Sequence, residues 1–253
     1  MMPNPYPLFR PAPNLTEFKN LIAIESTRHG GVSPAPFTSL NVGYNTPDTE
    51  ENVTENRLRL YSELGIRPDQ VASSHQIHGI EVLLAEAPGR YSGYDALITN
   101  KPGVFVGVSV ADCTPILVYD AHNQAVAAIH AGWRGTVGGV VSAALQAMKT
   151  SFNTRPADCY AYVGTCIDET SFEVGAEVAE QFAPGFKRLD AYTDTWFVNL
   201  KSANAHQLTS FGIPPSQIGI SSFSSVLNND DYYSHRLEKG QTGRMMALIG
   251  IKS

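Results

Sequence analysis

Three residues from separate segments have the side chains needed to hold one metal ion. His78, Cys113 and His130 each stand where an apolar run gives way to a loop that contains glycine or proline. Side chains at the ends of buried strands converge on a cleft while the scaffold holds them rigid. Two imidazoles and one thiolate suit zinc, and three protein ligands leave the fourth tetrahedral position free for water or substrate. The residue types therefore predict a catalytic zinc site.

The spacing of the three residues matches no compact zinc motif, so a second interpretation stays open: two hydrogen-bonded histidines beside a buried thiol. Asp112 favours the metal site, because an unpaired carboxylate at the end of an apolar run is costly. We expect its carboxylate either to orient a ligand histidine or to cap a turn. His75 competes with His78 for the first ligand position, and His29 is a candidate for the layer around the ligands.

A predicted helix start lies next to His130. The run Gly132-Trp-Arg-Gly135 precedes a helix that we expect from Thr136. Free N–H groups at a helix start and the guanidinium of Arg134 form an anion site of the kind that holds phosphate. The alternative is a glycine turn in which Trp133 packs and Arg134 pairs with a carboxylate. Arg28 and Arg244 are similar candidates for an anion contact.

The elements that must position these residues are mostly strands. Alternation and apolar runs predict strands at 21–27, 71–74, 81–85, 96–99, 104–110, 116–119, 125–130, 159–163, 197–200, 218–221 and 245–251, after an extended lead-in at 2–13. Helices are expected from a start within 46–51 to Leu64, at 136–148, at 175–182, and in the stretch that ends at Phe211. Strands without regular strand–helix alternation predict an α+β fold with layered mixed sheets.

Length and composition bound the class of protein. A chain of 253 residues with 43% hydrophobic residues has the size of one large domain, which we expect over 1–253. A net charge of -6 offers no basic face for a nucleic acid. The sequence shows neither a long apolar run nor a signal peptide, so we expect a cytoplasmic protein, monomeric or homodimeric, that does not bind membranes. Three widely spaced cysteines indicate reduced thiols, with Cys159 and Cys166 packed as small hydrophobes.

Taken together, several segments resemble the YfiH or laccase-domain family, described first as multicopper polyphenol oxidases and later as purine nucleoside phosphorylases. The resemblance covers nearly the whole chain. Its motifs, in order, are Thr27-Arg-His-Gly-Gly-Val-Ser33, Ser39-Leu-Asn-Val-Gly43, Asn56-Arg57, Gln76-Ile-His-Gly79, Asp95-Ala96, Ala111-Asp-Cys-Thr-Pro115, His130-Ala-Gly-Trp-Arg-Gly135, Phe172-Glu-Val-Gly175 and Thr242-Gly-Arg244. One departure is Thr165-Cys-Ile167, where the family commonly shows Gly-Pro and a following Ile-Gly.

The resemblance implies a fold, an activity and a set of site residues. The fold is a layered α/β sandwich related in outline to a toxin deamidase, and the zinc ligands are His78, Cys113 and His130. The activity is phosphorolysis of adenosine, inosine and methylthioadenosine, with deamination of adenosine as a side activity. In this interpretation Cys113, Asp112 and Arg134 are catalytic, and the purine nucleoside and phosphate contact Arg28, Asn41, Arg134, Glu173 and Arg244.

Three other functions compete with this one. A copper-dependent polyphenol oxidase, or laccase, needs several coppers, and the sequence lacks the closely spaced His-x-His ligand sets of such a cluster. Copper is therefore the lower-ranked metal. A metal-free hydrolase would use Cys113 as its nucleophile, activated by His130 or His78. The third is a binding or cell-wall quality-control factor in which the zinc site is a relic.

Overall fold

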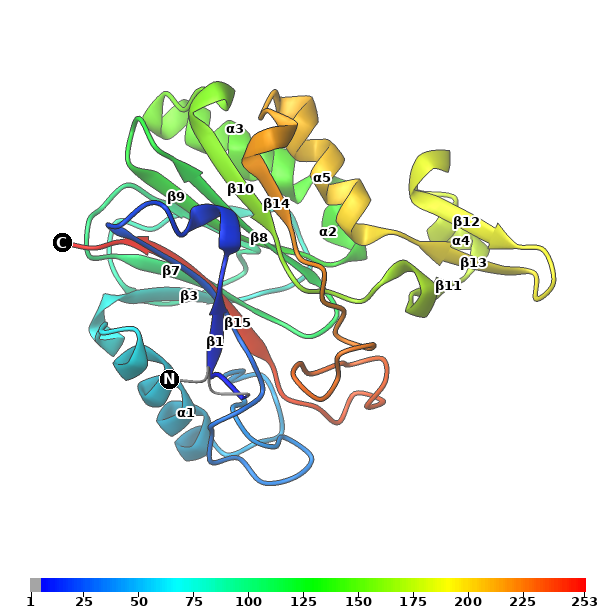
Figure 1. Cartoon of the computed structure of the whole chain (residues 1–253), viewed down its shortest axis with the longest axis horizontal. Coiled ribbons are helices and arrows are strands. Elements are labelled where there is room, and N and C mark those ends of the chain that lie inside the picture. The colour runs from blue at the N-terminus through cyan, green and yellow to red at the C-terminus, as the bar shows by residue number, and fades with distance from the viewer. Residues whose placement is uncertain (1–5) are drawn as a thin grey trace.

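Two six-stranded sheets form the centre of the computed structural model, which describes residues 6–253 (Figure 1). In spatial order, the first sheet contains β1 (Phe9–Pro11), β2 (Leu21–Ser26), β15 (Met245–Ile251), β7 (Phe105–Val110), β3 (Val71–His75) and β5 (Gly89–Ser92). The second contains β14 (Ile218–Ile220), β10 (Cys159–Val163), β8 (Thr114–Asp120), β9 (Ala125–Ala131), β6 (Ala96–Thr99) and β4 (Val82–Leu84). Both sheets mix parallel and antiparallel pairs.

The helices are α1 (Glu50–Glu63), α2 (Trp133–Gly138), α3 (Val140–Phe152), α4 (Ala176–Ala179) and α5 (Leu200–Phe211). Short 3-10 turns lie at Pro13–Leu15, Pro68–Gln70, Pro156–Asp158, Glu169–Ser171, Pro184–Phe186 and Pro215–Gln217. None of the helices in residues 6–253 is long and apolar enough to cross a membrane.

The alternation of side chains along the strands produces four layers. On β15, Met246 and Leu248 pack with α1, while Ala247 and Ile249 face the second sheet. Successive side chains of a strand point to opposite faces, so a strand with apolar residues at every position is covered on both sides. The other face of the second sheet is covered by α3 and α5 (Figure 1). The order α1, first sheet, second sheet, α3 with α5 confirms the predicted layered α+β fold.

A small third sheet projects from this body (Figure 1). It contains β11 (Glu173–Val174), β13 (Thr195–Val198) and β12 (Lys187–Asp190) in that order, and it was not predicted as a sheet. Its apolar cluster includes Cys166, Phe172 and Phe182. β12 was not predicted because most of its residues are polar or charged. An exposed edge strand buries little apolar surface, so it shows no apolar pattern in the sequence.

Two predicted elements are divided in the structure. The helix expected from Thr136 begins earlier, at Trp133, and breaks at Gly139, whose φ of 83° is left-handed. The strand expected at 197–200 ends at Val198, since Asn199 caps α5 by accepting a hydrogen bond from the backbone N–H of Ser202 at 2.9 Å. The helix expected at 175–182 is shorter in the structure, where only α4 is helical, and the strand β5 was not predicted. Residues 2–5 of the lead-in lie outside the described residues. The single-domain interpretation stays a prediction.

Leu117 tests the packing between the two sheets. It is 1% exposed on β8, in the cluster that the sheets share. We expect Leu117→Ala to lower the free energy of unfolding by about 2–5 kcal/mol, because it leaves a cavity in a close-packed layer. Urea denaturation measures the change, and Leu227→Ala, at a leucine that is 69% exposed, is the matched control with little expected effect.

Candidate metal centre and its cavity

The ends of three strands bring His78, Cys113 and His130 together. His78 follows β3 and Cys113 follows β7, and these strands are parallel neighbours, so their carboxyl ends meet at one edge of the first sheet. His130 stands near the end of β9 in the second sheet. The ligand atoms of the three side chains all lie within 4.8 Å of one another, and the group could hold a metal ion. The predicted cluster is therefore present, with His78 rather than His75 as its first member.

The backbone at the cluster has an uncommon conformation. His78 has a φ of 62° and Asp112, next to Cys113, a φ of 77°. Left-handed φ values are rare for residues other than glycine and cost on the order of 1–3 kcal/mol each. Before the turn at His78, the Gln76 side chain bonds both the N–H and the carbonyl of Ser109, at 2.9 and 2.8 Å, which keeps β3 beside β7. The two strands thus end in turns that aim their ligands at one point.

Gly132 allows the start of α2 to lie against the ligands. A Cβ at this position would stand 2.8 Å from Cδ2 of His78 and 3.0 Å from Sγ of Cys113. The glycine is required for close approach, since its φ of -69° suits any residue.

The side chain of Asp95 holds two of the three ligands. It is fully buried and accepts hydrogen bonds from the N–H groups of Ile77, His78 and Gly79, at 3.1, 3.0 and 2.8 Å. It also lies 2.7 Å from Nδ1 of His130. Burial alone would raise the pKa of Asp95, but the hydrogen bonds from His130 and the N–H groups lower it, so the carboxylate is charged. With Nδ1 engaged, Nε2 of His130 is the nitrogen left for a metal.

The suggestion that Asp112 orients a ligand histidine is wrong. Its two oxygens accept hydrogen bonds from the hydroxyl of Ser225 and the N–H of Arg236, both at 2.6 Å. Asp112 therefore ties two loops together beside Cys113, and Asp95 has the orienting role. Asp95 carried the same signal in the sequence, an acid beside an apolar strand, but no role was given to it.

Cys113 and His130 shift one another's pKa. Burial would raise the pKa of the Cys113 thiol, but the charge of His130 and hydrogen bonds from His130 and His78 outweigh it and lower the pKa from 9.0 to about 6. Burial would likewise lower the pKa of His130, yet Cys113 and Asp95 raise it from 6.5 to about 9. A thiolate at neutral pH is both a metal ligand and a nucleophile.

The three side chains of the cluster line a cavity of about 450 Å³. Its wall is about equally polar and apolar, and it carries several cationic side chains. Besides the three ligands, the lining includes Tyr44, Arg57, Ser73, His75, Gln76, Arg90, Asp112, Ile167, Phe172, His235, Arg236 and Arg244. Arg57, Arg90, Arg236 and His235 had no role in the sequence analysis, because residues brought in by α1, β5 and a long loop share no pattern along the chain.

Arg244 is a predicted substrate residue that lines the cavity. Its Nη1 donates to the carbonyl oxygens of Thr242 and Gly243, and within residues 6–253 it forms no ion pair with a carboxylate. Burial lowers the pKa of Arg244, while the charges of Cys113 and Asp112 act in the opposite direction. A partly buried guanidinium without a carboxylate partner, close to the metal cluster, favours an anionic ligand there.

The other predicted substrate residues lie outside the cavity wall. Arg134 is exposed and stacks on Trp133, with 4.3 Å between its guanidinium carbon and the ring centre. Glu173 is exposed as well. Asn41 is fully buried, and its side-chain oxygen accepts hydrogen bonds from the N–H groups of Gly43 and Arg244, at 3.1 and 2.9 Å. Asn41 therefore positions Arg244 instead of lining the substrate space.

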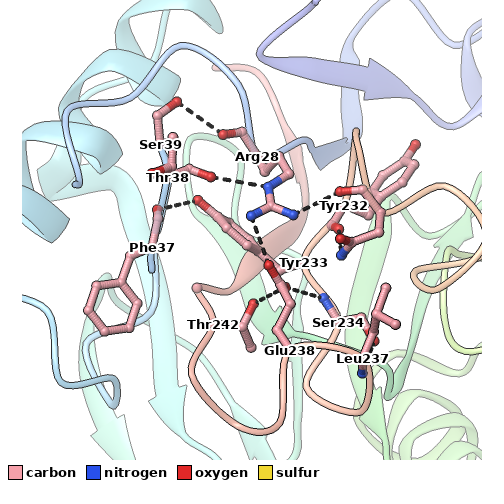
Figure 2. A network of polar contacts seen from close by, with 12 residues as sticks. Arg28, Phe37, Thr38, Ser39, Tyr232, Tyr233, Ser234, Leu237, Glu238 and Thr242 are labelled. Carbon is pink, nitrogen blue, oxygen red and sulfur yellow. Dashed lines mark hydrogen bonds and ion pairs between the residues drawn. The ribbon is translucent and has the colours of Figure 1, made fainter. Parts of the chain in front are cut away.

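Arg28 does not line the cavity and belongs instead to a network of polar contacts (Figure 2). Its guanidinium donates to the carbonyls of Thr38 and Asn229 and pairs with Glu238 at 2.9 Å. It packs 4.5 Å from the ring centre of Tyr233. These contacts join residues 28–39 to the loop 229–242, which carries His235 and Arg236. The neighbouring His29 pairs with Asp231 at 2.8 Å, so it does not contact the metal ligands.

Comparison with known proteins identifies the family of the chain. The sequence profile of a family described as multi-copper polyphenol oxidoreductase laccase matches residues 22–252. The chain belongs to this family. The YfiH resemblance drawn from the motifs is thereby confirmed.

Relatives of the family match along nearly their whole length. A protein of Deinococcus radiodurans named purine nucleoside phosphorylase is 39% identical over 229 residues, which is 89% of this chain and 87% of its own. Purine nucleoside phosphorylase YfiH of Escherichia coli K12 is 34% identical over 244 residues, or 94% and 97% of the two chains. The crystal structure of YlmD from Geobacillus stearothermophilus superposes with a TM-score of 0.89 at 30% identity and covers 93% of each chain.

Asp95→Asn tests whether Asp95 orients the candidate metal ligands. An amide cannot accept from three N–H groups and the His130 ring at once, so we expect metal affinity to fall about 10- to 100-fold. Competition with a chromogenic chelator measures it. Asp112→Asn is the matched control, because Asp112 contacts neither histidine. Equal losses in the two variants would contradict the role given to Asp95.

Alkylation of metal-stripped protein tests the charge state of Cys113. We expect iodoacetamide to modify Cys113 first, at a rate that rises through pH 6 and levels off above it, because the thiolate forms above a pKa of about 6. Cys159 and Cys166 are buried with pKa values raised to about 12, so they stay unmodified in the folded chain. Peptide mass spectrometry identifies the site, and Cys113→Ala must remove the fast reaction.

Proposed function

We propose that this protein is a zinc-dependent purine nucleoside phosphorylase, which acts on adenosine, inosine and methylthioadenosine and deaminates adenosine as a side activity. The observation that carries the proposal is the presence, in one cavity, of a three-ligand cluster and the unpaired guanidinium of Arg244. Relatives that match nearly the whole chain are named purine nucleoside phosphorylase, which supports the same activity.

The donor set fits zinc. Two imidazole nitrogens and a thiolate match the ligands of catalytic zinc, and Asp95 supplies the outer carboxylate that such sites use to orient a histidine. Bound there, zinc supplies a Lewis acid and a water of lowered pKa, which the deamination of adenosine would use.

Residues of the chain account for the needs of phosphorolysis. An oxygen of phosphate bonds to C1′ of the ribose, the bond from C1′ to the purine nitrogen breaks, and the base leaves with a proton. Arg244 holds the attacking phosphate, and Phe172 and Ile167 offer the base an apolar wall. Asp112 lines the cavity beside Cys113 and is proposed to handle the proton.

A copper-dependent polyphenol oxidase is the second candidate, because the matching family carries that description. Reduction of oxygen by a multicopper centre needs several ligand sets. Within residues 6–253, the cluster of His78, Cys113 and His130 is the one group of this kind. A metal-free hydrolase is the third, supported by the lowered pKa of Cys113 next to His130.

Metal content and phosphate dependence separate the three candidates. We expect one zinc per chain by elemental analysis, and release of hypoxanthine from inosine that requires phosphate. His78→Ala and Cys113→Ala should lose both the zinc and the activity. Several coppers per chain would favour the oxidase, and activity that survives chelation but not iodoacetamide would favour the hydrolase.

Arg244→Met tests the phosphate contact. Loss of a charge-assisted hydrogen bond in a partly buried site is expected to raise the KM for phosphate about tenfold or more, with zinc content unchanged. Arg134→Met is the matched control, since Arg134 is exposed and lies outside the cavity wall. Initial rates at varied phosphate concentration measure both. If Arg134→Met raises the KM for phosphate more than Arg244→Met does, phosphate binds at the helix start beside Arg134 instead.

A further inference from the structure

The wall of the cavity that the metal cluster lines also carries two arginines on one tyrosine. The guanidinium carbons of Arg57 and Arg90 lie 4.3 and 3.7 Å from the centre of the Tyr44 ring. We call these three residues the arginine–tyrosine stack. All three line the cavity of the metal site, and all three also line a second cavity of about 380 Å³. The stack therefore stands where the two spaces meet.

The described part of the chain neutralises the charge of the stack only in part. Arg57 is 8% exposed, its Nε donates to the carbonyl of Val42 at 2.8 Å, and it forms no ion pair within residues 6–253. Arg90 pairs with Glu50 at 3.0 Å, but both side chains are more than half exposed, so the pair is weak. A buried cation is costly without an anion, and a guanidinium fork suits the oxygens of a phosphate group.

The stack and the metal cluster line one cavity, and β3 links the two. Ser73 pairs in register with Arg90, lines both cavities, and lies five residues before His78. At ~3.3 Å per extended residue, five residues span at most about 16 Å, so the strand position opposite Arg90 lies within that distance of His78. A ligand that carries a base, a sugar and a phosphate can contact both parts of the cavity wall within this limit. Arg244 interacts with the charges of Cys113 and Asp112, whereas the two cations that stack on Tyr44 are Arg57 and Arg90.

We infer that the arginine–tyrosine stack is a second anion subsite, which takes the 5′-phosphate of a purine nucleoside monophosphate. The inference rests on the proposed function, because it assumes that the base and ribose bind near the metal cluster. The nucleotide occupies the same cavity as the unphosphorylated nucleoside and competes with it. Inorganic phosphate has the same chemistry, so the test must separate the two sources.

Titration calorimetry on the metal-loaded protein provides the test, with inosine, inosine 5′-monophosphate and inorganic phosphate as separate probes. We expect the monophosphate to bind at least about tenfold more tightly than inosine, as two charge-assisted contacts allow. Arg57→Met and Arg90→Met should each lower this ratio of affinities about tenfold. Glu50→Gln should raise it, because it frees Arg90.

Arg59→Met is the matched control, since Arg59 lies on the same helix as Arg57, pairs with Glu55 and lines neither cavity. If Arg57→Met fails to fold because Arg57 is buried, Arg90→Met still tests the subsite, because Arg90 is exposed on an edge strand. Equal affinities for inosine and its monophosphate would overturn the subsite. The subsite would also be overturned if Arg90→Met weakened the binding of inorganic phosphate as much as the binding of the monophosphate. If inosine fails to bind while the monophosphate binds through Arg90, the proposed function fails and the subsite stands.

Discussion

The buried carboxylate of Asp95 is the contact on which the site depends. Asp95 stands immediately before β6 in the second sheet, and the three N–H groups that donate to it belong to the turn after β3 in the first sheet. Its other bond goes to the ring of His130 on β9. One charged group thus fixes a turn from one sheet and a side chain from the other. A buried carboxylate needs these four partners, and by recruiting them it sets the geometry of two metal ligands.

The layered packing makes this contact possible. Two sheets whose strands are covered on both faces must lie close together, and their strand ends then share one edge of the sandwich. Ligands from β3, β7 and β9 converge there because each strand ends in a turn instead of continuing. Left-handed backbone at His78 and Asp112, and the absence of a side chain at Gly132, are local costs that the surrounding core compensates.

Hydrogen bonds behind the cavity hold its cations in place. Asn41 bonds the backbone of Arg244, and Arg28 with Glu238 ties down the loop that carries His235 and Arg236 (Figure 2). Some arginines of the family motifs therefore hold loops together, and others line the cavity. The difference lies in their partners. Both pack on a tyrosine ring, but Arg28 also pairs with a carboxylate, whereas Arg57 forms no ion pair within residues 6–253.

The sequence by itself determined the layered α+β class, most strands of the two large sheets, and the trio of His78, Cys113 and His130. Apolar alternation and donor chemistry are local properties, so they can be identified along the chain. The tertiary structure decided which polar residues serve that trio. Asp95 and Asp112 both border apolar strands, and only the packing of the sheets shows that Asp95 reaches His130. Likewise, Arg134 beside a helix start and Arg57 within a helix look alike as sequence, but one is solvent-exposed and the other lines the cavity. Distances between segments far apart in the chain are set by packing, which no local pattern encodes.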